Sequence, residues 1–133
     1  MVEVQQAEKD YSRAKQISNI LETLSKGTVI VEGAHDLKTL KRLGIDALTY
    51  SQLSSSGLPS ADVPVYLMMD DDKGGEEKEG KIKAMLLESG RPYVIDDTLG
   101  KRLLGMTNST SVEQIYRPIE DAKAKGMGAE KIR

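Results

Sequence analysis

Apolar residues along this chain form short continuous runs, which alternate with longer stretches where they recur every third or fourth position. The short runs are typical of strands buried on both faces, and the longer stretches have the spacing of amphipathic helices. The predicted strands span residues 28–31, 46–50, 65–69 and 91–97, and the predicted helices span residues 4–24, 36–43, 76–89 and 98–104. This alternation predicts an α/β fold with a parallel sheet of about four strands flanked by helices.

Three segments are predicted along the chain. Residues 1–26 are expected to form an N-terminal helix that packs on the domain, because its apolar stripe is short for a coiled coil with a second chain. Residues 27–106 hold the strands and form the α/β domain. Residues 107–133 are expected to form a C-terminal helical extension, in which a helix ends at Gly126 and the residues beyond it are frayed. The polar stretch 51–62 is predicted to be a surface loop or a short helix.

Composition narrows the possible functions. The formal net charge is −2, which argues against a tight nonspecific binder of nucleic acid. No cysteine is present, so thiol catalysis, disulfides and cysteine zinc sites are excluded. No apolar run approaches the roughly 20 residues that span a bilayer, and the N-terminus does not resemble a signal peptide, so a soluble cytoplasmic protein is expected. With no Trp or Phe and five Tyr, the chain has little material for stacking bases.

The most informative stretch is the apolar run 65–69 followed by three aspartates, Lys73 and two glycines. Side chains alternate along extended backbone, so Asp70 and Asp72 are expected on one side about 7 Å apart at Cα, where they can hold one hard cation. The glycines permit unusual backbone conformations, and a helix is expected to begin at about Glu76. The alternative interpretation is an acidic solvated loop with a glycine turn.

A second acid follows a strand at Glu32, directly after the apolar run 29–31. Ligands of open α/β sheets bind beyond the carboxyl ends of strands, so two acid-tipped strands could converge on one site. Glu32 could also be an exposed acid at a strand end. Asp36 is explained equally well by a site role and by the favourable place of a carboxylate in a first helical turn. Asp96 and Asp97 are expected to cap the next helix, with the rim of the metal site as the alternative.

Together the two motifs resemble those of the Toprim domain, which is shared by topoisomerases, primases and some nucleases. They are Val-Glu-Gly-x-x-Asp at 31–36 and, after an apolar strand, Asp-x-Asp-x-x-Gly-Glu at 70–76. The resemblance covers about residues 27–97 and implies a Toprim-like, Rossmann-type sheet. Because the chain is short, it is most similar to the small stand-alone Toprim proteins of archaea and bacteria, whose relatives include a maturase nuclease of ribosomal RNA.

The resemblance also implies roles for individual residues. Asp70 and Asp72 would bind a divalent cation, and Glu32 would act as general acid or base, or as a further ligand in a two-metal arrangement. Carboxylate oxygens suit magnesium or manganese and suit zinc poorly. Lys73 would stabilise a phosphate, or only offset the repulsion among the aspartates. The candidates for the substrate or phosphate rim are Gly33, Asp36, Gly75 and Lys38.

The sequence departs from the family beside the first motif. The family often has a lysine directly after the glycine, where this chain has Ala34. Lys38, Lys41 and Arg42 on the following helix are candidates to replace that phosphate contact, although basic residues on a helix are commonly a solvated face. His35 is the only histidine, and at a helix start it is more often a surface residue than a base or ligand.

The first functional hypothesis is a magnesium-dependent nuclease that hydrolyses RNA or DNA phosphodiesters, as a monomer or homodimer. Topoisomerases of this family need a nucleophilic tyrosine on another domain and primases need further domains, and this chain has room for neither. The second hypothesis is a noncatalytic module that binds metal, nucleotide or a protein partner within a nucleic-acid-processing assembly. A phosphoacceptor receiver domain ranks third, since the acid pair after the first strand and the late lysine that it needs are absent.

Overall fold

The computed structural model describes residues 2–132 and contains one sheet of four parallel strands. In chain order the strands are β1 Thr28–Val31, β2 Ala47–Thr49, β3 Val65–Met68 and β4 Ile95–Asp96. Their order across the sheet is β2-β1-β3-β4, so the two acid-tipped strands are the central neighbours. The predicted α/β fold with four parallel strands is confirmed. The strand predicted over 91–97 is wrong in length, because only two residues at this sheet edge pair with β3 and the preceding residues turn.

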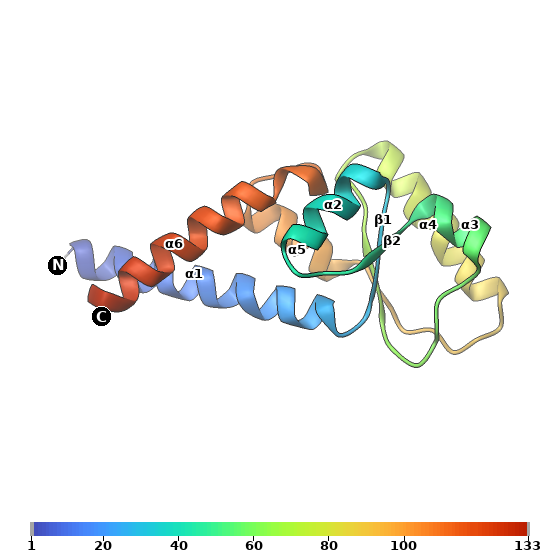
Figure 1. The fold of residues 1–133 in the computed structure, drawn as a ribbon, viewed down its shortest axis with the longest axis horizontal. Helices are drawn as coiled ribbons and strands as arrows, with labels where there is room; N and C mark the ends of the chain where they lie inside the picture. Colours follow the sequence, from blue (N-terminus) through green and yellow to red (C-terminus); the bar gives the residue numbers. More distant parts are fainter. Residues whose placement is uncertain (1, 133) are drawn as a thin grey trace.

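Helices surround the sheet (Figure 1). They are α1 Val2–Ser25, α2 Ala34–Arg42, α3 Tyr50–Ser56, α4 Lys73–Glu88, α5 Thr98–Met106 and α6 Tyr116–Ile132, with a 3₁₀ turn η1 at Val112–Gln114. Within the polar stretch 51–62 the short helix is the correct alternative, because Thr49 and Gln52 cap α3 reciprocally. α4 begins three residues earlier than predicted, since the Asp72 carboxylate caps it.

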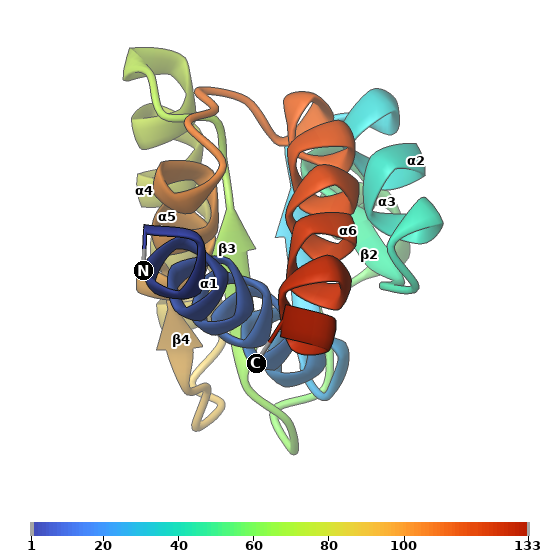
Figure 2. The same cartoon turned by 90° about the vertical axis from the view of Figure 1, so that its left-hand side faces the viewer.

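Each face of the sheet packs against its own helices: Figure 1 shows the strands between the two layers, and Figure 2 looks onto the layer that contains α1, α5 and α6. Alternate strand residues point to opposite faces, so Val29 and Val31 join the core beneath α1, α5 and α6, whereas Ile30 and Leu67 join the core beneath α3 and α4. The carboxyl ends of β1 and β3 are left at one edge between these layers. Within the described residues, no helix is long and apolar enough to cross a membrane.

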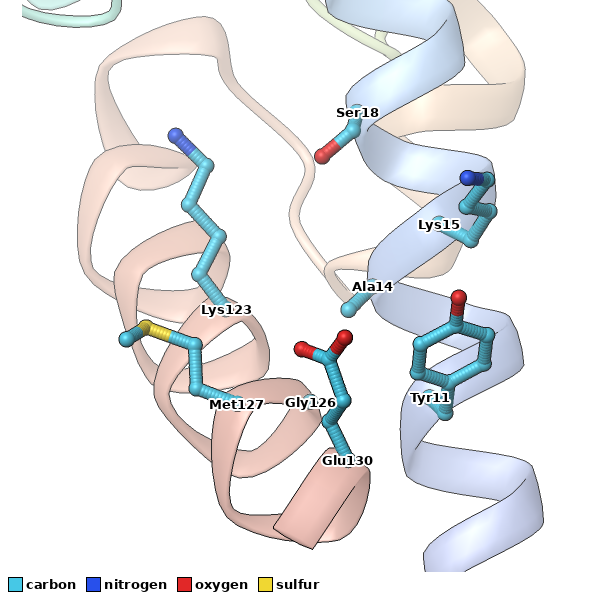
Figure 3. Close-up of a pocket in the computed structure, with 8 residues that line it drawn as sticks. All are labelled: Tyr11, Ala14, Lys15, Ser18, Lys123, Gly126, Met127 and Glu130. Atoms are coloured by element: carbon cyan, nitrogen blue, oxygen red, sulfur yellow. The ribbon is translucent and has the colours of Figure 1, made fainter. Parts of the chain in front are cut away.

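α6 contradicts the predicted C-terminal end. The helix runs through Gly126 to Ile132 instead of ending at the glycine, and Ala129 is buried rather than frayed. The reason is close packing: α1 and α6 lie side by side, and a Cβ on Gly126 would lie 2.4 Å from the Cβ of Ala14. Figure 3 shows the open groove beside this contact. It is lined by Tyr11, Ala14, Lys15, Ser18, Lys123, Gly126, Met127 and Glu130.

Two glycines of α6 provide a matched test of this packing. Gly126→Ala is expected to lower the free energy of unfolding by about 1–3 kcal/mol, because the added methyl group meets Ala14. At Gly128 an added methyl group meets nothing within 4 Å. Gly128→Ala should therefore leave the free energy of unfolding unchanged or raise it by up to about 1 kcal/mol through helix propensity. Urea unfolding of both variants measures the difference. Equal effects would show that the helices can separate at this point without cost.

Candidate metal centre

Three carboxylates meet at the carboxyl edge of the two central strands. Glu32 directly follows β1, Asp70 follows β3 after one residue, and Asp36 lies in the first turn of α2. One oxygen from each lies within 4.8 Å of the others, a spacing that can hold a metal ion. The sequence prediction that Glu32 and Asp70 share one edge of the sheet is confirmed. Asp36 was expected at the rim, and the structure brings it into the same cluster.

Backbone amides orient the three carboxylates. The Asp70 N–H donates to Oε2 of Glu32 at 3.1 Å, which joins the ends of the two strands. The Val112 N–H of η1 donates to Oδ1 of Asp70, also at 3.1 Å. The Gly33 N–H donates to Oδ2 of Asp36 at 3.2 Å, within the capping box of α2. Asp36, with 7% of its surface exposed, is therefore both a helix-start carboxylate, as the sequence predicts, and a member of the acid cluster, and a functional role for it stays a prediction.

Asp72 does not belong to this three-acid cluster. Its Oδ1 accepts a hydrogen bond from the Gly75 N–H at 2.7 Å, as the N-cap of α4. The extended backbone predicted from Asp70 to Asp72 is wrong, because the Asp72 N–H donates to the Asp70 carbonyl at 2.9 Å and the chain turns at Asp71. A metal-ligand role for Asp72 stays a prediction. The exposed Lys73 occupies the first position of α4, and no ion pair of it is found among the described residues.

The lysine that contacts the cluster is Lys78, which the sequence analysis did not identify. Its Nζ lies 3.2 Å from Oε1 of Glu32, and the lysine side chain is 43% exposed against 12% for the glutamate. Nothing in the sequence marks Lys78, since its contact depends on how α4 docks beside β1. The ammonium group of Lys78 therefore already neutralises part of the negative charge of Glu32.

Residues of the C-terminal extension line one side of the site. These contacts were also not predicted from the sequence. The Asp71 N–H donates to the Thr110 carbonyl at 2.8 Å, two residues before Val112, whose N–H contacts Asp70. Glu113 lines the same cavity as the cluster, so η1 adds a fourth acid. His35 lines the cavity too, and its side chain is exposed. Residues that were expected only to belong to a helical extension thus form one wall of the candidate site.

The electrostatics couple Glu32 and Asp70. Burial, and then the hydrogen bond with Glu32, raise the pKa of Asp70 to about 7. Burial would raise the pKa of Glu32 as well, but the hydrogen bonds from Asp70 and the Lys78 ion pair outweigh it, so the pKa of Glu32 is lowered. Burial raises the pKa of Asp36 against the opposing Gly33 N–H, and the negative charges of Glu32 and Glu113 add to the rise. Asp70 therefore keeps its proton up to about pH 7, beside a Glu32 carboxylate that stays ionised.

The remaining predicted acids lie elsewhere. Asp96 caps α5, as expected, by accepting hydrogen bonds from the N–H groups of Thr98 and Leu99. Asp97 pairs with Lys83 at 2.8 Å, in a separate network between α4 and α5. The other members of that network are Glu79 and Lys101. Neither aspartate belongs to the three-acid cluster.

Stability at this site is expected to fall with rising pH. The pKa of Asp70 rises from its ordinary value of 3.8 to about 7 on folding, so its stabilising contribution is fully present below about pH 4 and is lost as the pH passes 7. The lowered pKa of Glu32 has the opposite effect: its contribution to stability is lost as the pH falls, and only below the ordinary pKa of 4.5. At pH 8, where Asp70 has lost its proton, millimolar Mg²⁺ should bind the ionised carboxylates and raise the melting temperature by several degrees, and by less at pH 6, where protons compete.

Asp70→Asn is the control for this prediction. Its amide can donate to Glu32 and accept from the Val112 N–H, so without metal at pH 8 it should be at least as stable as the parent and respond less to Mg²⁺. Thermal melts of both proteins at pH 6 and 8, with and without Mg²⁺ or Mn²⁺, measure this. Unchanged melting temperatures of the parent with both metals at pH 8 would contradict a metal site.

Comparisons with known proteins support the assignment of the fold and give no information on the chemistry of the site. No protein-family model matches the chain, and no curated protein does. A solved structure of a protein from Aquifex aeolicus is similar, with a TM-score of 0.58 and 24% sequence identity. The match covers 74% of this chain and 96% of that one. At this identity the likeness establishes a shared α/β fold.

Proposed function

We propose that this chain is a Toprim-type nuclease that uses a divalent metal to hydrolyse RNA or DNA phosphodiesters. The observation that carries the proposal is the convergence of Glu32, Asp36 and Asp70 within 4.8 Å at the edge of adjacent parallel strands. This donor set is all oxygen and carries up to three negative charges, which fits magnesium or manganese better than zinc. The motifs at 31–36 and 70–76 support the family, since their acids supply this cluster.

The chain's own residues divide the work as follows. Asp70 and Asp36 would hold the cation, and Glu113 lines the same cavity. The motif at 70–76 is the only support for Asp72 as a further ligand, since its carboxylate caps α4. A bound magnesium ion supplies charge neutralisation of the phosphate and a more acidic water. The Val112 N–H fixes the Asp70 carboxylate, which keeps the ligand oxygens in place. Lys78 and the exposed Lys73 offer positive charge for the phosphate.

Glu32 would move the proton in hydrolysis. The lowered pKa of its carboxyl group keeps it ionised at neutral pH, so that it can accept a proton from an attacking water. Its two oxygens already accept hydrogen bonds, from Asp70 and from Lys78, which fix its orientation. None of the described tyrosines lines the cavity of the acid cluster, which favours attack by water over a covalent tyrosine intermediate.

A noncatalytic binding module is the second candidate function. The favouring observation is that the acid cluster is satisfied by the protein itself: Lys78 pairs with Glu32, and the Val112 N–H donates to Asp70. Such a cluster can persist without a cation. The net charge of −2 also suits a chain that binds protein as readily as nucleic acid.

Incubation with panels of RNA and DNA in Mg²⁺ and in Mn²⁺ separates the two functions. The parent should cleave at least one class of substrate, and Asp70→Asn should lose the cleavage while it remains folded. Chelation of the metal should also abolish cleavage by the parent protein. Cleavage by Asp70→Asn at the parent's rate would assign the activity to a contaminant and favour the binding module.

A further inference from the structure

The exposed face of α2 carries a group of basic residues that begins beside the acid cluster and is separate from Lys78 of α4. His35, Lys38, Lys41 and Arg42 are all exposed, and at 100° per residue they fall within about a third of the helix circumference. The buried residues of α2 lie on its opposite side: Asp36, Thr39 and Leu40. The helix is therefore sharply divided, with a buried inner side and a basic outer side. We call the four exposed residues the basic face.

This charge is not neutralised by neighbouring acids. Among the described residues, neither the two lysines nor the arginine of the basic face forms an ion pair with a carboxylate, whereas Lys78, Lys83 and Lys101 all do. Arg42 instead lies with its guanidinium 3.7 Å from the ring centroid of Tyr116, at the start of α6. That stacking holds the guanidinium plane while its N–H groups remain available to an acceptor.

The basic face begins at the mouth of the acid cluster. His35 lines the cavity that contains Glu32, Asp36 and Asp70, and α2 leads away from it along the outer side of the molecule (Figure 2). From His35 to Arg42 the helix rises about 10 Å. At about 3.4 Å for each nucleotide of a strand, this length matches about three nucleotides.

We infer that the basic face of α2 binds the phosphate backbone of a polynucleotide over about three nucleotides beside the phosphodiester at the acid cluster, an inference that rests on the proposed nuclease function. Lys38 and Lys41 would meet phosphates as point charges, and Arg42 would use its fixed guanidinium plane. Backbone contacts of this kind position the strand and carry no sequence preference. They also place the substrate strand despite the net negative charge of the chain.

The test compares two double variants that remove the same charge. Lys38→Gln/Lys41→Gln changes the basic face, and Lys81→Gln/Lys125→Gln changes exposed lysines of α4 and α6. Binding of fluorescent ten-nucleotide single strands of RNA and of DNA is measured by anisotropy in Mg²⁺ across a salt series, with Glu32→Gln also present so that substrate persists. Hydrolysis of bis(p-nitrophenyl) phosphate, which has no flanking nucleotides, is measured with Glu32 intact.

The basic-face pair should weaken oligonucleotide binding about tenfold or more and reduce the slope of log K against log salt by about 1.4, two contacts at about 0.7 each. The control pair should hydrolyse the small diester at the parent's rate. The control pair should bind like the parent. Equal affinity and slope for both pairs would overturn the inference, even if the parent is a nuclease. Binding that depends on the basic face without any hydrolysis by the parent would overturn the nuclease and retain the basic face as a nucleic-acid surface.

Discussion

Glu32→Gln is expected to lower turnover about 10²–10⁴-fold, the usual contribution of general acid–base catalysis. The amide keeps the shape of the side chain and can still accept the hydrogen bond from the Asp70 N–H, so the fold of the site should persist. It loses the ionised oxygen that pairs with Lys78 and that would take the proton. Affinity for metal should change little. Steady-state kinetics over a range of Mg²⁺ concentrations measure both quantities.

The contrasting variants are Asp36→Asn and Asp70→Asn. If these carboxylates are the main ligands, their replacement weakens metal binding, and part of the lost activity should return at higher metal concentration. Excess metal should not rescue Glu32→Gln, since a missing proton acceptor is not restored by cation. Rescue of Glu32→Gln alone would reverse the assignment and make Glu32 a ligand.

The core of this site could be predicted from sequence because one geometrical rule governs it. Acids that follow two neighbouring parallel strands must meet at one edge of the sheet, and β1 and β3 are neighbours. The position of Asp72 depended on a different rule, the alternation of side chains along extended backbone. That rule failed because the chain turns between Asp70 and Asp72. The meeting of these two strand ends was thus predictable, whereas the local course of the loop was not.

Contacts from distant segments could not be predicted at all. Val112 lies 42 residues beyond Asp70 in the chain, and only the docking of η1 brings its N–H to the carboxylate. Lys78 likewise reaches Glu32 through the placement of α4. Gly126 was misread for a related reason: glycine often ends a helix, but here it permits the approach of α1. Each miss depends on tertiary packing, which the local pattern of apolar residues does not encode.

Gly75 is the glycine on which the acid cluster depends most directly. A Cβ at this position would lie 2.0 Å from the carbonyl oxygen of Asp70 and 3.0 Å from its carbonyl carbon. Both atoms belong to the backbone and cannot move aside by changing a rotamer. The Gly75 N–H also donates to the Asp72 cap. The start of α4 and the loop that presents Asp70 are therefore packed against each other with no room for a side chain.

Gly75→Ala is expected to reduce turnover at least about 10²-fold, because a displacement of about 1 Å at a reacting centre has that effect. It should also lower the free energy of unfolding by about 1–3 kcal/mol and diminish the response of the melting temperature to Mg²⁺. Kinetics and thermal melts measure these changes. Gly74→Ala is the nearest control, since its Cβ would meet only Oδ1 of Asp72 at an ordinary 3.5 Å.

Gly80→Ala, on the same helix in open space, should keep the activity and raise the free energy of unfolding by up to about 1 kcal/mol. The three alanine variants therefore separate helix propensity, which all share, from the contact that only Gly75→Ala makes with Asp70. If Gly75→Ala were as active and as responsive to Mg²⁺ as Gly74→Ala, the loop of Asp70 would be free to shift, and the close packing of α4 could not be what holds the cluster in place.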